Sequence, residues 1–247
     1  MTRSTRTGLN YLILTTVVLA SWQLLFLRVG SDAVLGPVET VDQLIKFLRT
    51  KEFWIDIAET LKAFSAALAI SIIGGLALGV LFGMHRLSGV VAEPLLIAGY
   101  SIPKVTLYPV VLLLFGLGMP AKICFGVMHG IIPIIIFTMN GIRQINPIFL
   151  RTARSLRISH WDTVRTILFP AALPQIVTGL RVGFSLTLLG TLIGEMFGSQ
   201  HGLGFILMSA IGLHQVPTIM AVTTFIVVPA LIASFCFLAI ESRLYSR

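Results

Sequence analysis

Apolar stretches long enough to cross a membrane recur along the whole chain, and no other feature limits its fold as strongly. A helix needs about 20 predominantly apolar residues to cross the hydrocarbon core of a bilayer. Such stretches account for most of the 247 residues. We therefore expect an all-α integral membrane protein that forms a single domain over 1–247. Its expected spans are 9–27, 60–83, 94–118, 121–141, 172–197 and 217–240.

The distribution of cations predicts how the spans are oriented. Only 11% of the residues are charged, against about a quarter in soluble domains, so the net charge of +8 indicates cytoplasmic loops rather than a nucleic-acid partner. With the N-terminus inside, the inner segments hold Arg3, Arg6, Arg86, Arg143, Arg151, Arg154, Arg157, Arg165, Arg243 and Arg247. The outer segments hold Arg28, Lys46, Arg49, Lys51 and Lys122. This excess predicts six spans with both termini in the cytoplasm.

Prolines and glycines distinguish two of the spans. Pro94, Pro103 and Pro109 each remove a helix donor from the third span, and such breaks are tolerated where protein or a water-filled cavity covers the backbone. We therefore expect the third span to be irregular and to lie along a pathway. In the second span, Gly75 and Gly79 belong to a G-x-x-x-G-x-x-x-G ladder that predicts close helix packing.

The segment 151–174, RTARSLRISHWDTVRTILFPAALP, lies in the expected inner loop 142–171. Ser159 and Asp162 have the spacing of a capping box, so a short helix is expected to begin near His160 and to stop at Pro170. A further helix is expected over about 147–156. Two interpretations remain open: the loop rests on anionic lipid, or it docks a cytosolic protein through its aromatic and arginine side chains.

The same segment resembles the cytoplasmic loop of ABC-importer permeases, whose pattern is E-A-A, three residues, Gly, nine residues, and I-x-L-P. Arg151-Thr152-Ala153 stands in the E-A-A place, Arg157 in the Gly place, and 167–170 in the I-x-L-P place. The stretches 101–123, 170–181 and 190–210 are similar to the nitrate, sulfonate and taurine branch of that family.

The resemblance implies a type I ABC importer permease fold in a bacterial inner membrane, with the loop forming coupling helices that dock into cytosolic ATPase subunits. It also implies a second permease copy, an extracytoplasmic binding protein, and a small anionic solute or a related aromatic or vitamin-precursor solute. The chain has no G-x-x-x-x-G-K-[ST] loop, so ATP and Mg²⁺ are expected on the partner. The coupling residues it implies are Arg151, Ala153, Arg154, Leu156, Arg157, Ser159, His160, Trp161, Asp162, Arg165, Ile167 and Pro170.

Two residues depart from the family pattern. A glycine at the end of a helix tolerates φ > 0, whereas Arg157 would pay about 1 kcal/mol for it. We therefore expect a tighter or less kinked turn here. Arg151 reverses the charge of the usual glutamate, so a compensating acid is expected in the ATPase.

Four residues are pathway candidates: Pro103, Lys104, Arg181 and Glu195. A buried carboxylate is costly unless it is paired, so Glu195 has either a hydrogen-bonding or a transport role. Arg181 is expected to extend to the inner surface, while Lys104 could do the same or attract an anion. No catalytic residue, metal ligand or bound cofactor is expected.

The rival function is an ion-coupled secondary transporter or channel that works without an ATPase. Such proteins usually carry several intramembrane ionisable residues or paired broken helices in two halves. The expected spans hold Glu195 as their one deep acid and no detectable inverted pair. The sequence therefore favours the ATP-driven permease.

Overall fold

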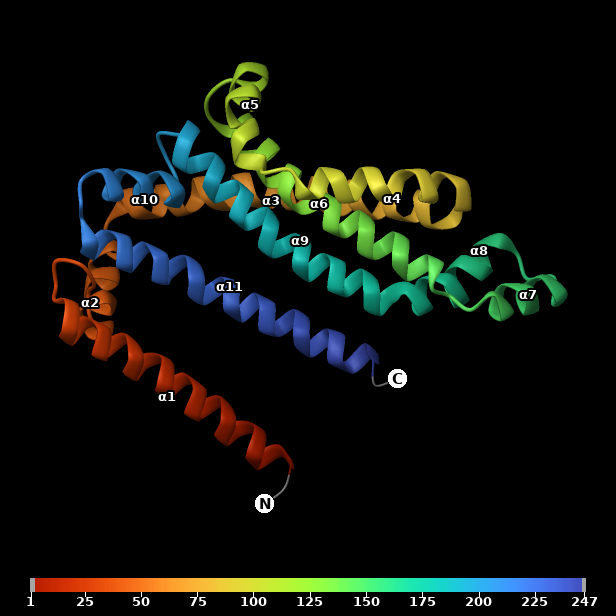
Figure 1. Ribbon diagram of the computed structural model, residues 1–247, viewed down its shortest axis with the longest axis horizontal. Coiled ribbons are helices and arrows are strands. Elements are labelled where there is room, and N and C mark those ends of the chain that lie inside the picture. Colours follow the sequence, from red (N-terminus) through yellow and green to blue (C-terminus); the bar gives the residue numbers. More distant parts are fainter. Residues whose placement is uncertain (1–2, 246–247) are drawn as a thin grey trace.

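The computed structural model describes residues 3–245, and within them the side chains of 13–85, 87–149, 151–153, 155–159 and 162–244. Every regular element of this part is a helix, as expected (Figure 1). The elements are α1 (Arg3–Val29), α2 (Pro37–Leu48), α3 (Lys51–Met84), α4 (Arg86–Ser101), the 3₁₀ turn η1 (Lys104–Leu107), α5 (Tyr108–Phe115), α6 (Met119–Arg143), α7 (Pro147–Ser155), α8 (His160–Thr163), the π turn η2 (Val164–Leu168), α9 (Phe169–Gly198), α10 (Leu203–Gly212) and α11 (Val216–Tyr245).

Four helical segments are long and apolar enough to cross a membrane: α3, α6, η2 with α9, and α11. Helix α4 and the η1–α5 segment make a fifth if the pair, bent by 84°, is counted as one span. The apolar part of α1 among the described side chains is Ile13–Val29, so the first expected span begins outside them. The six-span topology therefore stays a prediction.

Helix α3 begins at Lys51 rather than at residue 60. Its extra N-terminal turns carry Glu52, Asp56 and Glu59, which an apolar window excludes from a span. These turns are nevertheless helical, and Phe53 and Ile57 on them are buried in a cluster with residues of α10 and α11. Tertiary burial of one face extends the helix beyond its apolar run.

The predicted glycine ladder packs against α6, which confirms its expected role. A Cβ built on Gly75 would lie 2.7 Å from Ile134 Cβ, and one on Gly79 would lie 2.6 Å from Thr138 Cβ. Real Cβ atoms essentially never approach so closely, so the two helices meet at the distance that only glycine permits.

Helix α9 also approaches α6 closely at glycine positions. A Cβ on Gly190 would lie 2.5 Å from the carbonyl oxygen of Phe125, and one on Gly194 would lie 2.9 Å from Lys122 Cα. Helices α3, α6 and α9, which all pack against one another, therefore form one tightly packed core.

The third span is irregular as predicted, but only one of its prolines breaks it. Pro94 lies inside α4, and Pro109 lies in the first turn of α5, where a helix does not need its N–H. The break lies between α4 and η1, at Pro103. An ion pair of 2.8 Å between Arg143 and Glu93 ties α4 to the end of α6.

Four of the short helices lie in two pairs at opposite ends of the molecule (Figure 1). Helices α2 and α10 lie at one end, and α7 and α8 lie at the other. Helix α1 extends away from the core and is joined to the loop before α2 by a 2.8 Å hydrogen bond from Trp22 Nε1 to the carbonyl of Leu35. The long helices α3, α6 and α9 run between the end that holds α2 and α10 and the end that holds α7 and α8.

Candidate functional site

The first candidate site is the loop formed by α7, α8 and η2. Helix α7 ends in a Schellman turn: Ile158 N–H donates to the carbonyl of Ala153 at 3.0 Å, and Arg157 has φ +52°. The expectation of a tighter or less kinked turn is therefore wrong. Arg157 adopts the left-handed conformation of a helix-ending glycine, at a cost of about 1 kcal/mol.

Helix α8 begins at His160, as predicted, and Ser159 caps it, although its second bond to Asp162 runs through the hydroxyl and not through the backbone N–H of a capping box. Asp162 N–H donates to Ser159 Oγ at 3.1 Å, and Ser159 Oγ–H donates to Asp162 Oδ2 at 2.6 Å. Within the loop, Arg151, Leu156, Arg157 and Arg165 are exposed, whereas Ala153 is buried. Ile167 is half-buried and Pro170 is exposed. The side chains of Arg154, His160 and Trp161 lie outside the described residues.

The expected stop at Pro170 is wrong, because the helix continues from α8 through η2 into α9. Phe169 N–H donates to the carbonyl of Val164, five residues earlier, which makes a π turn. A proline ends an α-helix when its ring meets the carbonyl four residues before it. Here the π turn precedes Pro170 and the helix continues past it, so the loop is continuous with a membrane-spanning helix.

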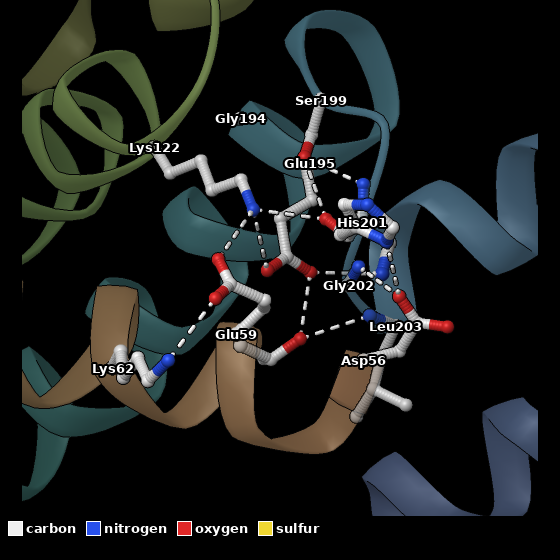
Figure 2. A network of polar contacts seen from close by, with 12 residues as sticks. Asp56, Glu59, Lys62, Lys122, Gly194, Glu195, Ser199, His201, Gly202 and Leu203 are labelled. Atoms are coloured by element: carbon white, nitrogen blue, oxygen red, sulfur yellow. Dashed lines mark hydrogen bonds and ion pairs between the residues drawn. The ribbon is translucent and has the colours of Figure 1, made fainter. Parts of the chain in front are cut away.

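The second candidate site is a buried polar network at the other end of the core (Figure 2). Glu195 on α9 and Lys122 on α6 are 0% and 2% exposed, and their Oε1 and Nζ atoms are 3.7 Å apart. Lys122 Nζ also donates to the carbonyl of His201 at 2.8 Å and lies 3.9 Å from Glu59 Oε2. The network thus joins three helices and the connection before α10.

The acids and hydroxyls of this network hold the N-terminus of α10. The N–H of Gly202 donates to Asp56 Oδ1 at 2.7 Å, that of Leu203 to Thr60 Oγ1 at 2.8 Å, and that of Gly204 to Glu195 Oε2 at 2.9 Å. Thr60 Oγ1–H donates to the same Glu195 oxygen at 2.9 Å. The free N–H groups of a helix start favour negative charge, so α3 and α9 supply the cap that Gly202 lacks.

Gly202 is required at this position for two reasons. Its φ is +117°, a conformation that residues with a Cβ rarely adopt. A Cβ there would also overlap the carboxylate of Glu195. The strained turn before α10 and its contact with Glu195 therefore explain why glycine stands at this position.

A cleft of about 580 Å³ opens beside the network. Its polar lining includes Glu59, Lys122, Ser199, Gln200 and His201. Glu59 Oε1 lies 3.2 Å from Lys62 Nζ, one turn further along α3. The cleft therefore presents charges of both signs at the end of the molecule where α10 lies.

The structure does not gather the four pathway candidates in one place. Arg181 Nε lies 3.1 Å from Glu241 Oε2 on α11, so it forms an interhelical ion pair instead of simply extending to a surface. Lys104 Nζ donates to the carbonyl of Tyr100 at 3.2 Å at the end of α4, beside the exposed Pro103. Glu195 alone belongs to the buried network.

Sequence reasoning missed Lys122, which it counted among the outer cations, and also missed Asp56 and Thr60. The spacing of Asp56 and Thr60 is i, i+4, which places both on one helix face. Lys122 follows the start of its helix by one turn. Those spacings could have suggested an inward-facing polar cluster. They could not have identified its partners, because Glu195 is 135 residues from Thr60 and His201 is 79 residues from Lys122.

Comparison with known proteins agrees with this architecture. The family described as "Binding-protein-dependent transport system inner membrane component" matches residues 46–247. The nitrate import permease protein NrtB of Leptolyngbya laminosa is 30% identical over 78% of this chain and 72% of its own. The taurine transport system permease protein TauC of Escherichia coli is 24% identical over 90% of this chain and 83% of its own.

Solved structures share the fold. A chain of the inward-facing MetNI methionine ABC transporter superposes with a TM-score of 0.65 and 18% identity, over 77% of this chain and 96% of that chain. With the family match extending over most of its length, the chain belongs to the family of inner-membrane components of binding-protein-dependent transport systems.

Proposed function

We propose that this protein is the permease subunit of an ATP-driven ABC importer, with six spans, both termini in the cytoplasm, and a translocation pathway formed by two permease copies. The observation that carries the proposal is the continuity of α8, η2 and α9. A force applied to the α7–α8 loop acts directly on a span that is tightly packed against α6. Such a loop is suited to transmit movement from a cytosolic ATPase to the membrane core.

The residues proposed to contact the ATPase are those of the loop: Arg151, Ala153, Arg154, Leu156, Arg157, Ser159, His160, Trp161, Asp162, Arg165, Ile167 and Pro170. Their roles differ by position. Ser159 and Asp162 form the cap of α8, and buried Ala153 holds α7 in place. The exposed arginines and Leu156 are available to a partner, in a combination of side chains that is common at protein interfaces.

At the opposite end, the surface around α2 and α10 is proposed to receive the soluble binding protein. The network at Glu195 supports a structural role for that carboxylate, because its Oε2 accepts two hydrogen bonds that hold α10. Transport then proceeds by alternating access: ATP-driven closure of the ATPase subunits moves the coupling loop, and the core helices follow. The permease performs no covalent chemistry, and ATP and Mg²⁺ belong to the partner.

The proposed substrate is a small organic or inorganic anion of the sulfonate, taurine or nitrate type, or a related small aromatic or vitamin-precursor solute. Support comes from relatives named for nitrate and taurine, and from a formylaminopyrimidine permease of Halalkalibacterium halodurans that is 27% identical over 76% of each chain. The binding protein is proposed to make the choice among these solutes.

Reconstitution tests the proposal. Proteoliposomes that contain the permease, its co-purifying ATPase and the binding protein should accumulate radiolabelled solute only when ATP is enclosed on the ATPase side. Omission of the ATPase, or its replacement by a variant that cannot hydrolyse ATP, should abolish uptake. Uptake driven by an ion gradient without ATP would establish the secondary transporter or channel instead.

A further inference from the structure

Arg157 holds a backbone conformation that a smaller residue would adopt at lower cost. Within residues 3–245 only Arg157 and His214 combine a side chain with a left-handed φ. Glycine and asparagine adopt that conformation more readily. A residue keeps a strained backbone conformation where interactions of its side chain offset the cost, and such positions cluster at functional sites.

In the described part of the chain, no ion pair of the Arg157 side chain offsets this cost. The Arg157 side chain is exposed, and among the described side chains it forms no ion pair within 4.0 Å. The same holds for Arg151 and Arg165. The one acid between residues 147 and 170 is Asp162, which is engaged by Ser159 in the cap of α8. The loop surface is therefore cationic without internal compensation.

We propose that Arg157 is a partner-specificity residue, whose guanidinium binds a carboxylate in the groove of the cognate ATPase subunit, with Arg151 adding a second cationic contact. The proposal rests on the importer function proposed above and adds the chemistry by which the ATPase is recognised. An ATPase whose groove lacks carboxylates would leave these guanidinium groups desolvated without a partner, and would bind more weakly.

The geometry favours a protein partner over lipid headgroups. The Schellman turn, closed by the Ile158-to-Ala153 hydrogen bond, fixes Arg157 at the junction of α7 and α8. The turn thus fixes the backbone position from which the exposed side chain projects, and the planar guanidinium of an arginine suits bidentate binding to a carboxylate. Attraction to an anionic membrane surface depends on the number of cations near it and would be served equally by an unstrained arginine elsewhere.

The test compares Arg157→Asn with Arg49→Asn, a matched change at an exposed arginine on the predicted outer side. Permease variants are placed in nanodiscs of neutral phosphatidylcholine, and the Kd for the purified ATPase that accompanies the wild-type permease is measured by titration. We expect Arg157→Asn to raise the Kd about tenfold, and Arg49→Asn to leave it unchanged. The wild-type Kd should also rise more steeply with salt than that of Arg157→Asn.

Thermal unfolding separates recognition from folding. Asparagine relaxes the left-handed strain, so the Tm of the Arg157→Asn permease should equal or exceed that of the wild type while its binding weakens. Equal Kd values for Arg157→Asn and wild type would overturn the inference, and so would a difference that requires anionic lipid in the nanodisc. Failure of the wild-type permease to bind any ATPase would overturn the importer function itself.

Discussion

Removal of the buried ammonium of Lys122 is the sharpest test of the polar network. Glu195 is 0% exposed, and its Oε2 already accepts hydrogen bonds from Thr60 and Gly204. Its Oε1 has no hydrogen-bond donor among the described residues and relies on Lys122 Nζ at 3.7 Å. Lys122→Met keeps the length and apolar stem of the side chain but leaves a buried carboxylate without its cation.

The expected cost follows from the burial of both groups. Removing one partner of a buried pair costs about 3 kcal/mol or more, which for a chain of this size lowers the Tm by about 6 to 12 °C. Thermal unfolding of the purified permease in detergent measures this change. The double variant Lys122→Met/Glu195→Gln should recover about half of the loss or more, because glutamine retains an acceptor for Thr60 and Gly204 and carries no charge.

Two outcomes of these measurements would contradict the role assigned to Lys122. A Lys122→Met permease that unfolds within about 2 °C of the wild type would show that the ammonium does not stabilise Glu195. A double variant less stable than Lys122→Met would show that the carboxylate acts independently of it. Glu195→Gln alone should preserve the fold, and loss of folded protein in that variant would argue against a hydrogen-bonding role.

Three further predictions concern packing and capping. Gly79→Ala should destabilise the permease by about 1 to 3 kcal/mol, because its Cβ would overlap Thr138, whereas Gly212→Ala meets nothing within 4 Å and should be neutral or stabilising by Tm. Ser159→Ala should cost about 1 kcal/mol locally and speed amide exchange in α8 without changing the overall Tm. Thr60→Val should speed exchange at the start of α10, since it removes a donor and an acceptor at once; unchanged exchange there would contradict the proposed cap.

Local patterns in the chain were sufficient for much of the fold. The cap at Ser159 depends on residues within a few positions of one another, so spacing predicts it. The ladder at Gly75 and Gly79 was also recognisable, because small residues four apart have few uses in a span other than close packing. Apolar periodicity located the long helices to within several residues of their ends.

Two local rules gave wrong results for the loop because the surrounding structure overrode them. A proline normally ends a helix, but the helix here continues from the π turn at 164–168 past Pro170 into α9. Arg157 normally avoids positive φ, but the turn between α7 and α8 imposes it. In both cases, a conformation that costs about 1 kcal/mol or more is retained by the elements on either side of it.

The sequence by itself determined that this chain is helical and membrane-embedded and where its long helices lie. It also identified the loop 142–171 as a candidate functional site. These properties follow from composition and short-range spacing. Only the tertiary structure decided that Lys122, Thr60 and Glu195 meet at the start of α10, and that Arg181 pairs with Glu241. Those contacts join helices far apart in the chain, and a single sequence carries no record of which distant side chains share a buried space.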